Sequence, residues 1–337
     1  MITRLTTRLG ITHPVILAPM ESVSGGRLAA AVSQAGGLGL VAGGYGDYQW
    51  LARQFALAEG SRVGCGFITW ALADDPAALY KALQHLRPVA VLLSFGDPRP
   101  YARAVRESGA ILMTQIQTLS DARRALEAGA DVIVAQGTEA GGHGIDNRST
   151  MTLVPAVTDL VTAQAPGTPV VATGGIADGR GIAAALALGA DGVLMGTRFW
   201  ATAEALAPRA AQARLIEATG ERTLRTAVVD VAEGRPWPSP FTSRVLRNQF
   251  TDQWHEAEEA LSADPGAVRE QYSCAAATGN YDIAAVSSSQ SAGLIGSVSP
   301  AGELVSSLMA EAEDTISRLR GQLRVEHPGR TPSDQTG

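Results

Sequence analysis

The highest density of potentially reactive groups lies at residues 136–144, QGTEAGGHG. This segment holds four glycines and one histidine, His143, and begins at the end of an apolar run at 131–137. A glycine-rich chain can lie against a planar ligand because it carries no side chains that would keep the ligand away. An imidazole can act near neutral pH as an acid, a base or a hydrogen-bond donor to an anion. His143 is therefore the candidate catalytic residue, and a role limited to ordering its loop is the alternative.

Two later apolar runs end in glycine. The sequence reads Gly-Gly-Ile at 174–176 and Met-Gly-Thr at 195–197, and each stretch precedes an expected helix. Main-chain N–H groups at such turns can bind a phosphate, and a helix N-terminus adds a partial positive charge. Tight turns would also explain these glycines, but their occurrence after both runs favours a phosphate site.

The other reactive residue types have structural interpretations. We expect Glu139 and Asp146 to pair with arginines, and Cys65, inside an apolar run at 62–70, to be buried and inert. No spacing of histidine, cysteine and carboxylate residues indicates a metal site. The remaining histidines lie in stretches with no catalytic signature: His13, His85, His255 and His327.

The segments that must position these residues form a regular series. Short, continuously apolar runs recur roughly every 25 residues, about the length of a strand, a helix and two loops. Runs of this kind are typical of parallel strands that are buried on both faces. Eight of them predict a (β/α)8 TIM barrel; a doubly wound sheet is the alternative. The runs are 14–20, 38–44, 62–70, 89–95, 110–116, 131–137, 169–175 and 191–197.

Helical stretches alternate with these runs, and in a barrel the carboxyl ends of the strands share one rim. We predict N-caps at Ser120 and Asp178, and helix-terminating glycines at Gly109, Gly129 and Gly189. The expected helices are 76–86, 98–108, 120–128 and 178–188.

After residue 197 the pattern changes. We expect helices at 202–219, 248–262 and 300–323, a Pro- and Arg-rich passage at 235–248 and a Ser/Gly-rich loop at 279–299. The predicted organisation is a barrel with a smaller second domain inserted before the C-terminal helix. The predicted barrel comprises residues 1–217 plus 300–325, the small substrate-capping domain residues 218–299, and the flexible tail residues 326–337.

Composition narrows the class of protein. The chain has 337 residues, of which 45% are hydrophobic, and a formal net charge of −6, without the basic run that a nucleic-acid groove would need. No stretch reaches the roughly 18 apolar residues of a membrane span, and the first ten residues lack a secretory signal pattern. Two cysteines suggest a reducing cytoplasm. An apolar face on the expected helix at 202–219 would permit a homodimer.

Taken together, the motifs resemble those of the nitronate monooxygenase family, over about residues 5 to 320. The resemblance implies a flavoenzyme that holds FMN in a TIM barrel. The stretches that carry it are PVILAPM at 14–20, GCGFITW at 64–70, AQGTEAGGHG at 135–144, VVATGGIADGRG at 170–181, DGVLMGTRF at 191–199 and SQSAGLI at 289–295.

This resemblance assigns roles to individual residues. His143 corresponds to the active-site histidine above the flavin, and Ser291 would approach the substrate, although Ser289 stands where the family usually has glycine. The residues expected near the flavin ring and ribityl chain are Pro19, Met20, Thr69, Gln115, Gln136, Gly137, Ala140, Gly141 and Gly142. Those expected at its phosphate are Gly174, Gly175, Met195, Gly196 and Thr197.

The activity that the resemblance implies is oxidation of a nitronate by FMN and O2, which gives a carbonyl compound and nitrite. His143 would stabilise the nitronate anion or remove the α-proton of a nitroalkane. An FMN-dependent enoyl-[acyl-carrier-protein] reductase that uses NAD(P)H is the nearest alternative, since it shares the barrel and a similar GGH loop. The GFITW and SQSAGLI stretches favour the monooxygenase. A non-catalytic flavin-binding protein remains a further alternative, as does an oxidase of a larger nitro or amino compound.

Overall fold

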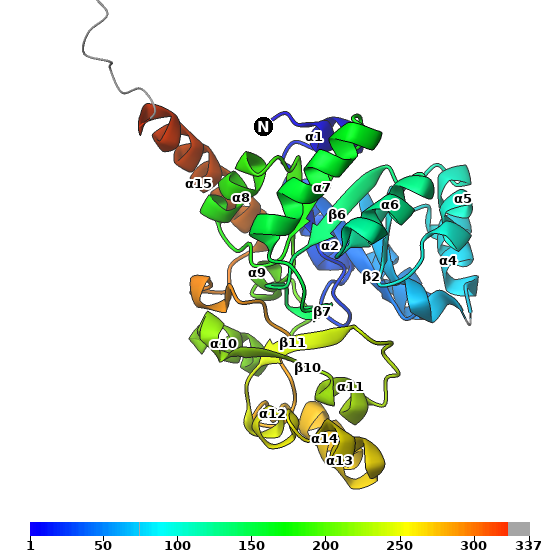
Figure 1. Ribbon diagram of the computed structural model, residues 1–337, viewed down its shortest axis with the longest axis vertical. Coiled ribbons are helices and arrows are strands. Elements are labelled where there is room, and N and C mark those ends of the chain that lie inside the picture. Colours follow the sequence, from blue (N-terminus) through cyan, green and yellow to red (C-terminus); the bar gives the residue numbers. More distant parts are fainter. Residues whose placement is uncertain (74, 323–337) are drawn as a thin grey trace, which may run out of the picture.

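The architecture is a closed barrel of eight parallel strands (Figure 1). The computed structural model describes residues 1–73 and 75–322, so the expected tail at 326–337 lies outside the described residues. Every predicted apolar run contains one barrel strand, and β1 pairs with β9 to close the ring, which confirms the predicted TIM barrel. The strands are β1 (Val15–Leu17), β2 (Leu38–Gly44), β3 (Val63–Ile68), β4 (Ala90–Ser94), β5 (Ile111–Ile116), β6 (Val132–Gln136), β8 (Val170–Thr173) and β9 (Gly192–Met195).

Helices follow the strands and surround the barrel. The glycines predicted to end helices adopt positive φ: 82° at Gly109, 75° at Gly129 and 95° at Gly189. Asp178 caps α8 as predicted, by accepting a hydrogen bond from the Gly181 N–H. The helices are α1 (Arg4–Leu9), α2 (Gly26–Gln34), α3 (Tyr48–Leu57), α4 (Ala77–Lys81) with the π-turn η2 (Ala82–Leu86), α5 (Arg99–Glu107), α6 (Leu119–Glu127), α7 (Thr150–Gln164), α8 (Gly179–Ala187) and α9 (Thr197–Trp200). A 3-10 turn, η1 (Thr69–Ala73), follows β3.

The N-cap predicted for α6 is wrong by two residues. Thr118 caps this helix, because its hydroxyl accepts from the Asp121 N–H while the Asp121 carboxylate accepts from the Thr118 N–H. This reciprocal capping box satisfies two otherwise unpaired N–H groups, which a cap at Ser120 would not do.

The hydrophobic core has two layers that meet at the strands. Inward-pointing residues such as Ile16, Leu40 and Leu92 fill the barrel, and Leu5 and Leu9 of α1 join them. Outward-pointing residues of the same strands pack against the helices. Each strand thus packs one apolar face inside the barrel and the other against the helices, as its continuously apolar sequence predicts.

The segment 203–299 forms a second layer over the carboxyl ends of the strands (Figure 1). Its strands β10 (Thr223–Thr226) and β11 (Thr242–Leu246) form an antiparallel sheet with β7 (Gly142–Gly144), a short strand that the sequence did not predict. Its helices and turns are α10 (Arg209–Glu217), η3 (Gly220–Arg222), α11 (Val228–Glu233), α12 (Gln249–Trp254), α13 (Glu258–Ala263), α14 (Gly266–Thr278) and η4 (Ala292–Leu294). Helix α15 (Ala301–Gln322) then packs on α8 and α2.

Two helix predictions in this segment are wrong in extent. The expected helix at 202–219 is only α10, because Pro208 has no N–H to bond with residue 204 and stands at the N-cap in an extended conformation. The expected helix at 248–262 is split into α12 and α13 around residues 255–257, and the sequence carries no helix breaker there.

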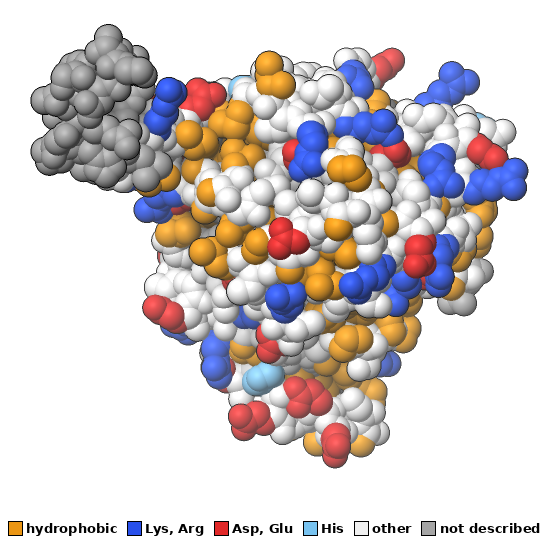
Figure 2. Space-filling view, turned by 45° about the horizontal axis from the view of Figure 1, so that its top comes forward, with side chains coloured by type: hydrophobic (Ala, Val, Ile, Leu, Met, Phe, Trp, Pro, Cys, Tyr) orange, Lys and Arg blue, Asp and Glu red, His pale blue; other side chains and the backbone are white. Residues whose placement is uncertain are grey.

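Charged side chains of both signs are interspersed over the face shown in Figure 2. Across residues 1–73 and 75–322, no helix combines the length and the apolar character that crossing a bilayer requires.

Candidate active site

A cavity of about 430 Å³ lies at the carboxyl ends of the barrel strands. Residues at or just after the end of each barrel strand line its floor, and residues of the 203–299 segment, among them Asp230 and Trp237, line its roof. Its volume is within the range of small-molecule sites, and this rim is where barrel enzymes place their chemistry.

Most of the predicted site residues meet in this cavity. Those that line it are Pro19, Met20, Gln115, Gln136, Ala140, Gly141, Gly142, His143, Gly174, Gly175, Gly196 and Thr197. Four predicted residues are not part of the lining: Thr69, Gly137, Met195 and Ser291. Thr69 and Met195 are buried, with Met195 in the layer between strands and helices. The Ser291 hydroxyl lies 2.6 Å from that of Ser289, and of these two serines it is Ser289 that lines the cavity.

One end of the cavity is suited to an anion. Gly174 and Gly175 turn there with φ of 112° and 72°, conformations that side chains rarely adopt. Within the described part of the chain, the N–H groups of Gly175 and Gly196 donate to no protein acceptor. The Thr197 hydroxyl accepts a hydrogen bond from the Ser289 N–H at 3.1 Å, which holds the late serine-rich loop at this end. Free N–H groups at two neighbouring turns can form a cradle for an anion such as a phosphate.

A chain of buried glutamines crosses the barrel rim. The Gln136 side-chain oxygen accepts from the amides of Gln117 at 2.7 Å and Gln115 at 3.2 Å. Its amide nitrogen donates to the main-chain oxygen of His143 at 3.1 Å. Gln136 is thereby fixed, and it holds the histidine backbone in turn. Sequence reasoning missed Gln117, although its two-residue spacing from Gln115 along one strand face is a signal for it.

His143 is held by groups from distant parts of the chain. Its Nε2 lies 2.8 Å from Oδ1 of Asp230 on α11, and its ring stacks on Trp237 with centroids 3.5 Å apart. Phe95, after β4, meets the ring edge-on at 6.3 Å. His143 itself belongs to β7, where it is paired with Ser243 of β11. Asp230 and Trp237 were not predicted, because no local motif marks a partner about 90 residues away; the Pro-rich passage at 235–248 was the only signal.

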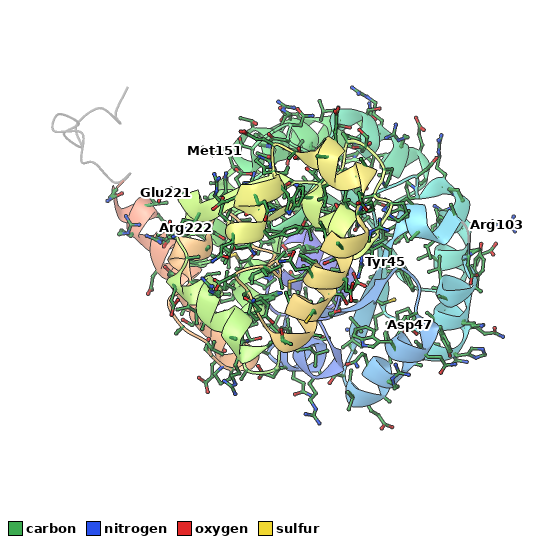
Figure 3. All side chains as sticks on the ribbon, turned by 90° about the horizontal axis from the view of Figure 1, so that it is seen from below. Tyr45, Asp47, Arg103, Met151, Glu221 and Arg222 are labelled. Carbon is green, nitrogen blue, oxygen red and sulfur yellow. The ribbon has the colours of Figure 1, made fainter. Side chains whose placement is uncertain are left out.

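Charged and aromatic groups line the cavity near Trp237. Trp237 Nε1 donates to the Tyr45 hydroxyl at 2.7 Å, and the Arg235 guanidinium lies 4.4 Å from the centre of the Tyr45 ring. Arg235 also forms ion pairs with Glu21 at 2.5 Å and Glu233 at 3.0 Å. Burial raises the pKa of Glu233, and the nearby Arg235 offsets this only in part. Burial likewise raises the pKa of Tyr45, which Figure 3 places nearer the middle of the molecule than Asp47 of the same loop.

The predicted arginine partners of Glu139 and Asp146 are wrong. The Glu139 carboxylate accepts from both the N–H and the hydroxyl of Thr150 and so caps α7, while Asp146 accepts from the Thr138 hydroxyl. Arginines do reach this loop, but Arg225 donates to the main-chain oxygens of Thr138 and Ala140. The arginines at this loop thus donate to main-chain carbonyls that have no hydrogen-bond partner within a strand or helix.

Cys65 is fully buried, as predicted, and burial raises the pKa of its thiol. Among the residues that the structure describes, no group of three or more histidine, cysteine and carboxylate side chains could hold a metal ion.

The cavity fits a planar ligand with an anionic tail. Pro19 lies so close to Gly66 that a Cβ on this glycine would be 2.3 Å from the proline ring, so only glycine leaves Pro19 its place in the wall. The fixed amides of Gln115 and Gln136 supply hydrogen bonds along the rim, and the Gly175–Gly196 end supplies free donors. These features fit the ring and the phosphate of the expected flavin.

Comparisons with known proteins find relatives over most of the chain. The family model described as nitronate monooxygenase matches residues 3–60 and 75–311. A nitronate monooxygenase from Neurospora crassa is 34% identical over 91% of this chain and 91% of its own length. Among solved structures, FabK from Thermotoga maritima has a TM-score of 0.82 and 32% identity over 96% of this chain and 99% of its own. A nitroalkane oxidase from Streptomyces ansochromogenes has a TM-score of 0.76 and 31% identity over 94% and 100%.

Proposed function

The chain belongs to the nitronate monooxygenase family, whose members are flavoproteins, and we propose that it uses FMN and O2 to oxidise a nitronate or nitroalkane to a carbonyl compound and nitrite. The observation that carries this proposal is the position of His143: it faces the same cavity as the phosphate cradle at Gly174, Gly175, Gly196 and Thr197. A reactive imidazole and an anion cradle in one cavity of this size are what a flavin enzyme with a small substrate needs.

The proposed flavin site uses the residues that line the cavity. Pro19 and Met20 would contact the ring, Gln115 and Gln136 would hydrogen-bond to it, and Ala140, Gly141 and Gly142 would lie along it. Bound FMN would supply the acceptor for the substrate's electrons. The proposal keeps four residues that do not line the cavity as supports for residues that do. Thr69, Gly137 and Met195 each adjoin a lining residue in the chain, and the Ser291 hydroxyl hydrogen-bonds to that of Ser289.

His143 would act on the substrate itself. In its neutral form it can accept the α-proton of a nitroalkane, and in its charged form it can hold a nitronate anion by a hydrogen bond. The rings of Trp237, Tyr45 and Phe95 around it would exclude water from the reacting atoms. Exclusion of water strengthens each electrostatic interaction inside the site.

We also propose a division into domains, a cellular location and an oligomeric state. Residues 1–217 and 300–325 would form the flavin-binding barrel, and 218–299 the substrate cap; the contribution of Asp230 and Trp237 to the roof supports this division. A cytoplasmic location is supported by the exposed free thiol of Cys274. The expected apolar face for a homodimer is not exposed on α10, whose outer positions include Arg209, Arg214 and Glu217, so the proposed dimer rests on the molecular mass in solution as its test.

O2 uptake tests the proposal. Purified protein should show a flavin absorbance spectrum, release FMN on denaturation and consume O2 with an alkyl nitronate in the absence of NADH. A yellow protein that turns over no nitronate in a panel of chain lengths would refute the activity and leave the fold unaffected.

The structural similarity to FabK supports the enoyl reductase as a second candidate. That enzyme would consume NADH with an enoyl thioester such as crotonyl-CoA, and nitronates would not be required. Steady NADH consumption with the thioester, without nitronate-dependent O2 uptake, would favour it over the monooxygenase.

A further inference from the structure

Asp230 is the only carboxylate hydrogen-bonded to the active-site histidine among the described residues, and it comes from the cap. It is 4% exposed, so its charge is almost fully withdrawn from water. Its Oδ1 lies 2.8 Å from His143 Nε2, and its Oδ2 is buried without a protein hydrogen-bond partner. A buried carboxylate is costly unless it is paired, so the histidine contact is the interaction that compensates it.

The nearby arginine is engaged by other carboxylates, while the charge of Asp230 helps to raise the pKa of both Glu233 and Tyr272. Glu233, also on α11, and Glu21, after β1, both pair with Arg235, so the arginine charge is directed at them. The Tyr45 hydroxyl faces the site from the loop after β2 and accepts from Trp237. Across residues 1–73 and 75–322, no lysine or arginine forms an ion pair with Asp230, and its one such contact is with His143.

The contact assigns the hydrogen on the imidazole ring. A carboxylate can only accept, so Nε2 carries the hydrogen that it donates to Asp230. Within the described residues, Nδ1 makes no hydrogen bond to the protein and so stays free as a proton acceptor. Carboxylate–histidine pairs of this type fix the tautomer and stabilise the imidazolium that forms when the free nitrogen takes a proton.

We propose that Asp230 is the positioning residue for His143 and that it makes this histidine a base for neutral nitroalkanes. This inference rests on the proposed function. The substrate's α-C–H bond breaks, its proton moves to Nδ1, and the electron pair stays on the substrate as the nitronate. The imidazolium keeps its Nε2–H bond to the Asp230 carboxylate.

The same geometry makes catalysis depend on the cap. Asp230 holds the edge of the ring and Trp237, seven residues later, covers its face at 3.5 Å. Both come from the chain between β10 and β11, whereas His143 comes from the barrel loop after β6. The barrel thus supplies the base, and the cap supplies the group that sets its protonation.

The test compares two substrates of one enzyme. Asp230→Asn keeps the volume of the side chain but removes the charge, and its amide can donate to Nε2 and impose the other tautomer. With a neutral nitroalkane, kcat/KM should fall by about 10²- to 10⁴-fold, the usual contribution of a general base. With the matching preformed nitronate, which needs no proton removal, it should fall by less than about fivefold.

The matched control is Asp252→Asn, which changes an exposed carboxylate on α12 and should leave both substrates unaffected. Asp230→Glu should recover part of the nitroalkane activity, because it restores the charge. The flavin content and melting temperature of each variant report on folding.

Each outcome has one meaning. An equal loss with both substrates shows that Asp230 only supports the fold, and a wild-type enzyme that oxidises nitronates but no nitroalkane also overturns the inference while the proposed function stands. A wild-type protein that oxidises neither substrate refutes the proposed function itself.

Discussion

Gly141→Ala tests the contact between the barrel loop and the late serine loop that borders the phosphate end. A Cβ on Gly141 would lie 2.5 Å from the carbonyl carbon of Ser288 and 2.6 Å from the nitrogen of Ser289. Both atoms are backbone, so the 288–289 loop must move by about an ångström to reach ordinary contact distance. That movement would break the Ser289 N–H bond to Thr197, at the turn expected to bind the phosphate.

Overpacking of this kind costs about 1–3 kcal/mol. If the cost falls on the flavin-bound state, the dissociation constant of FMN should rise by about 5- to 150-fold, at 1.4 kcal/mol per tenfold. Quenching of flavin fluorescence on titration with the apoprotein measures this constant. Gly296→Ala is the control, because a Cβ there meets no atom within 4 Å and its φ lies outside the left-handed region. If Gly141→Ala folds and binds FMN within twofold of wild type, the serine loop does not close the phosphate site.

Three further outcomes are expected. His143→Ala should lose about 10²- to 10⁴-fold in turnover of a neutral nitroalkane yet keep its yellow colour, as absorbance and O2 uptake will show; unchanged turnover of that substrate would remove the histidine from the chemistry. Because burial raises the folded-state pKa of Glu233, wild type loses stability as pH rises from the ordinary glutamate pKa through the raised one. The melting temperature of Glu233→Gln relative to wild type should therefore increase with pH across that window, and a constant difference would contradict the argument. An aromatic disulfide reagent should modify only Cys274 in the native protein, and both Cys274 and Cys65 in denaturant. Rapid modification of two thiols in the native protein would be inconsistent with a buried Cys65.

The barrel was predictable because its physical signal is local. A parallel strand that is buried on both faces must be continuously apolar, and the glycines that end several of the helices mark where the next strand begins. Gly109, Gly129 and Gly189 illustrate this, since each has the positive φ that its position requires. The same reasoning brought His143 and the glycines of the anion cradle to one rim.

The rest of the site depends on contacts between distant segments. Asp230 meets His143 only because β7 joins the β10–β11 sheet, and a three-residue strand in a glycine-rich loop has no sequence signal. Partner choice also depends on which acceptors remain unsatisfied: Arg225 bonds to loop carbonyls, while Glu139 caps α7. The spacing of residues along a sequence does not show which of several donors or acceptors a side chain will bond to in the fold.

The central claim is that a flavin in this cavity takes electrons directly from a nitronate at His143. Anaerobic mixing of the flavin-loaded protein with an alkyl nitronate, followed by absorbance in a stopped-flow instrument, tests it most directly. We predict that the flavin band bleaches without NADH and returns when O2 is admitted, with nitrite and the carbonyl compound formed. A flavin that stays oxidised with nitronate but bleaches with NADH would contradict the account.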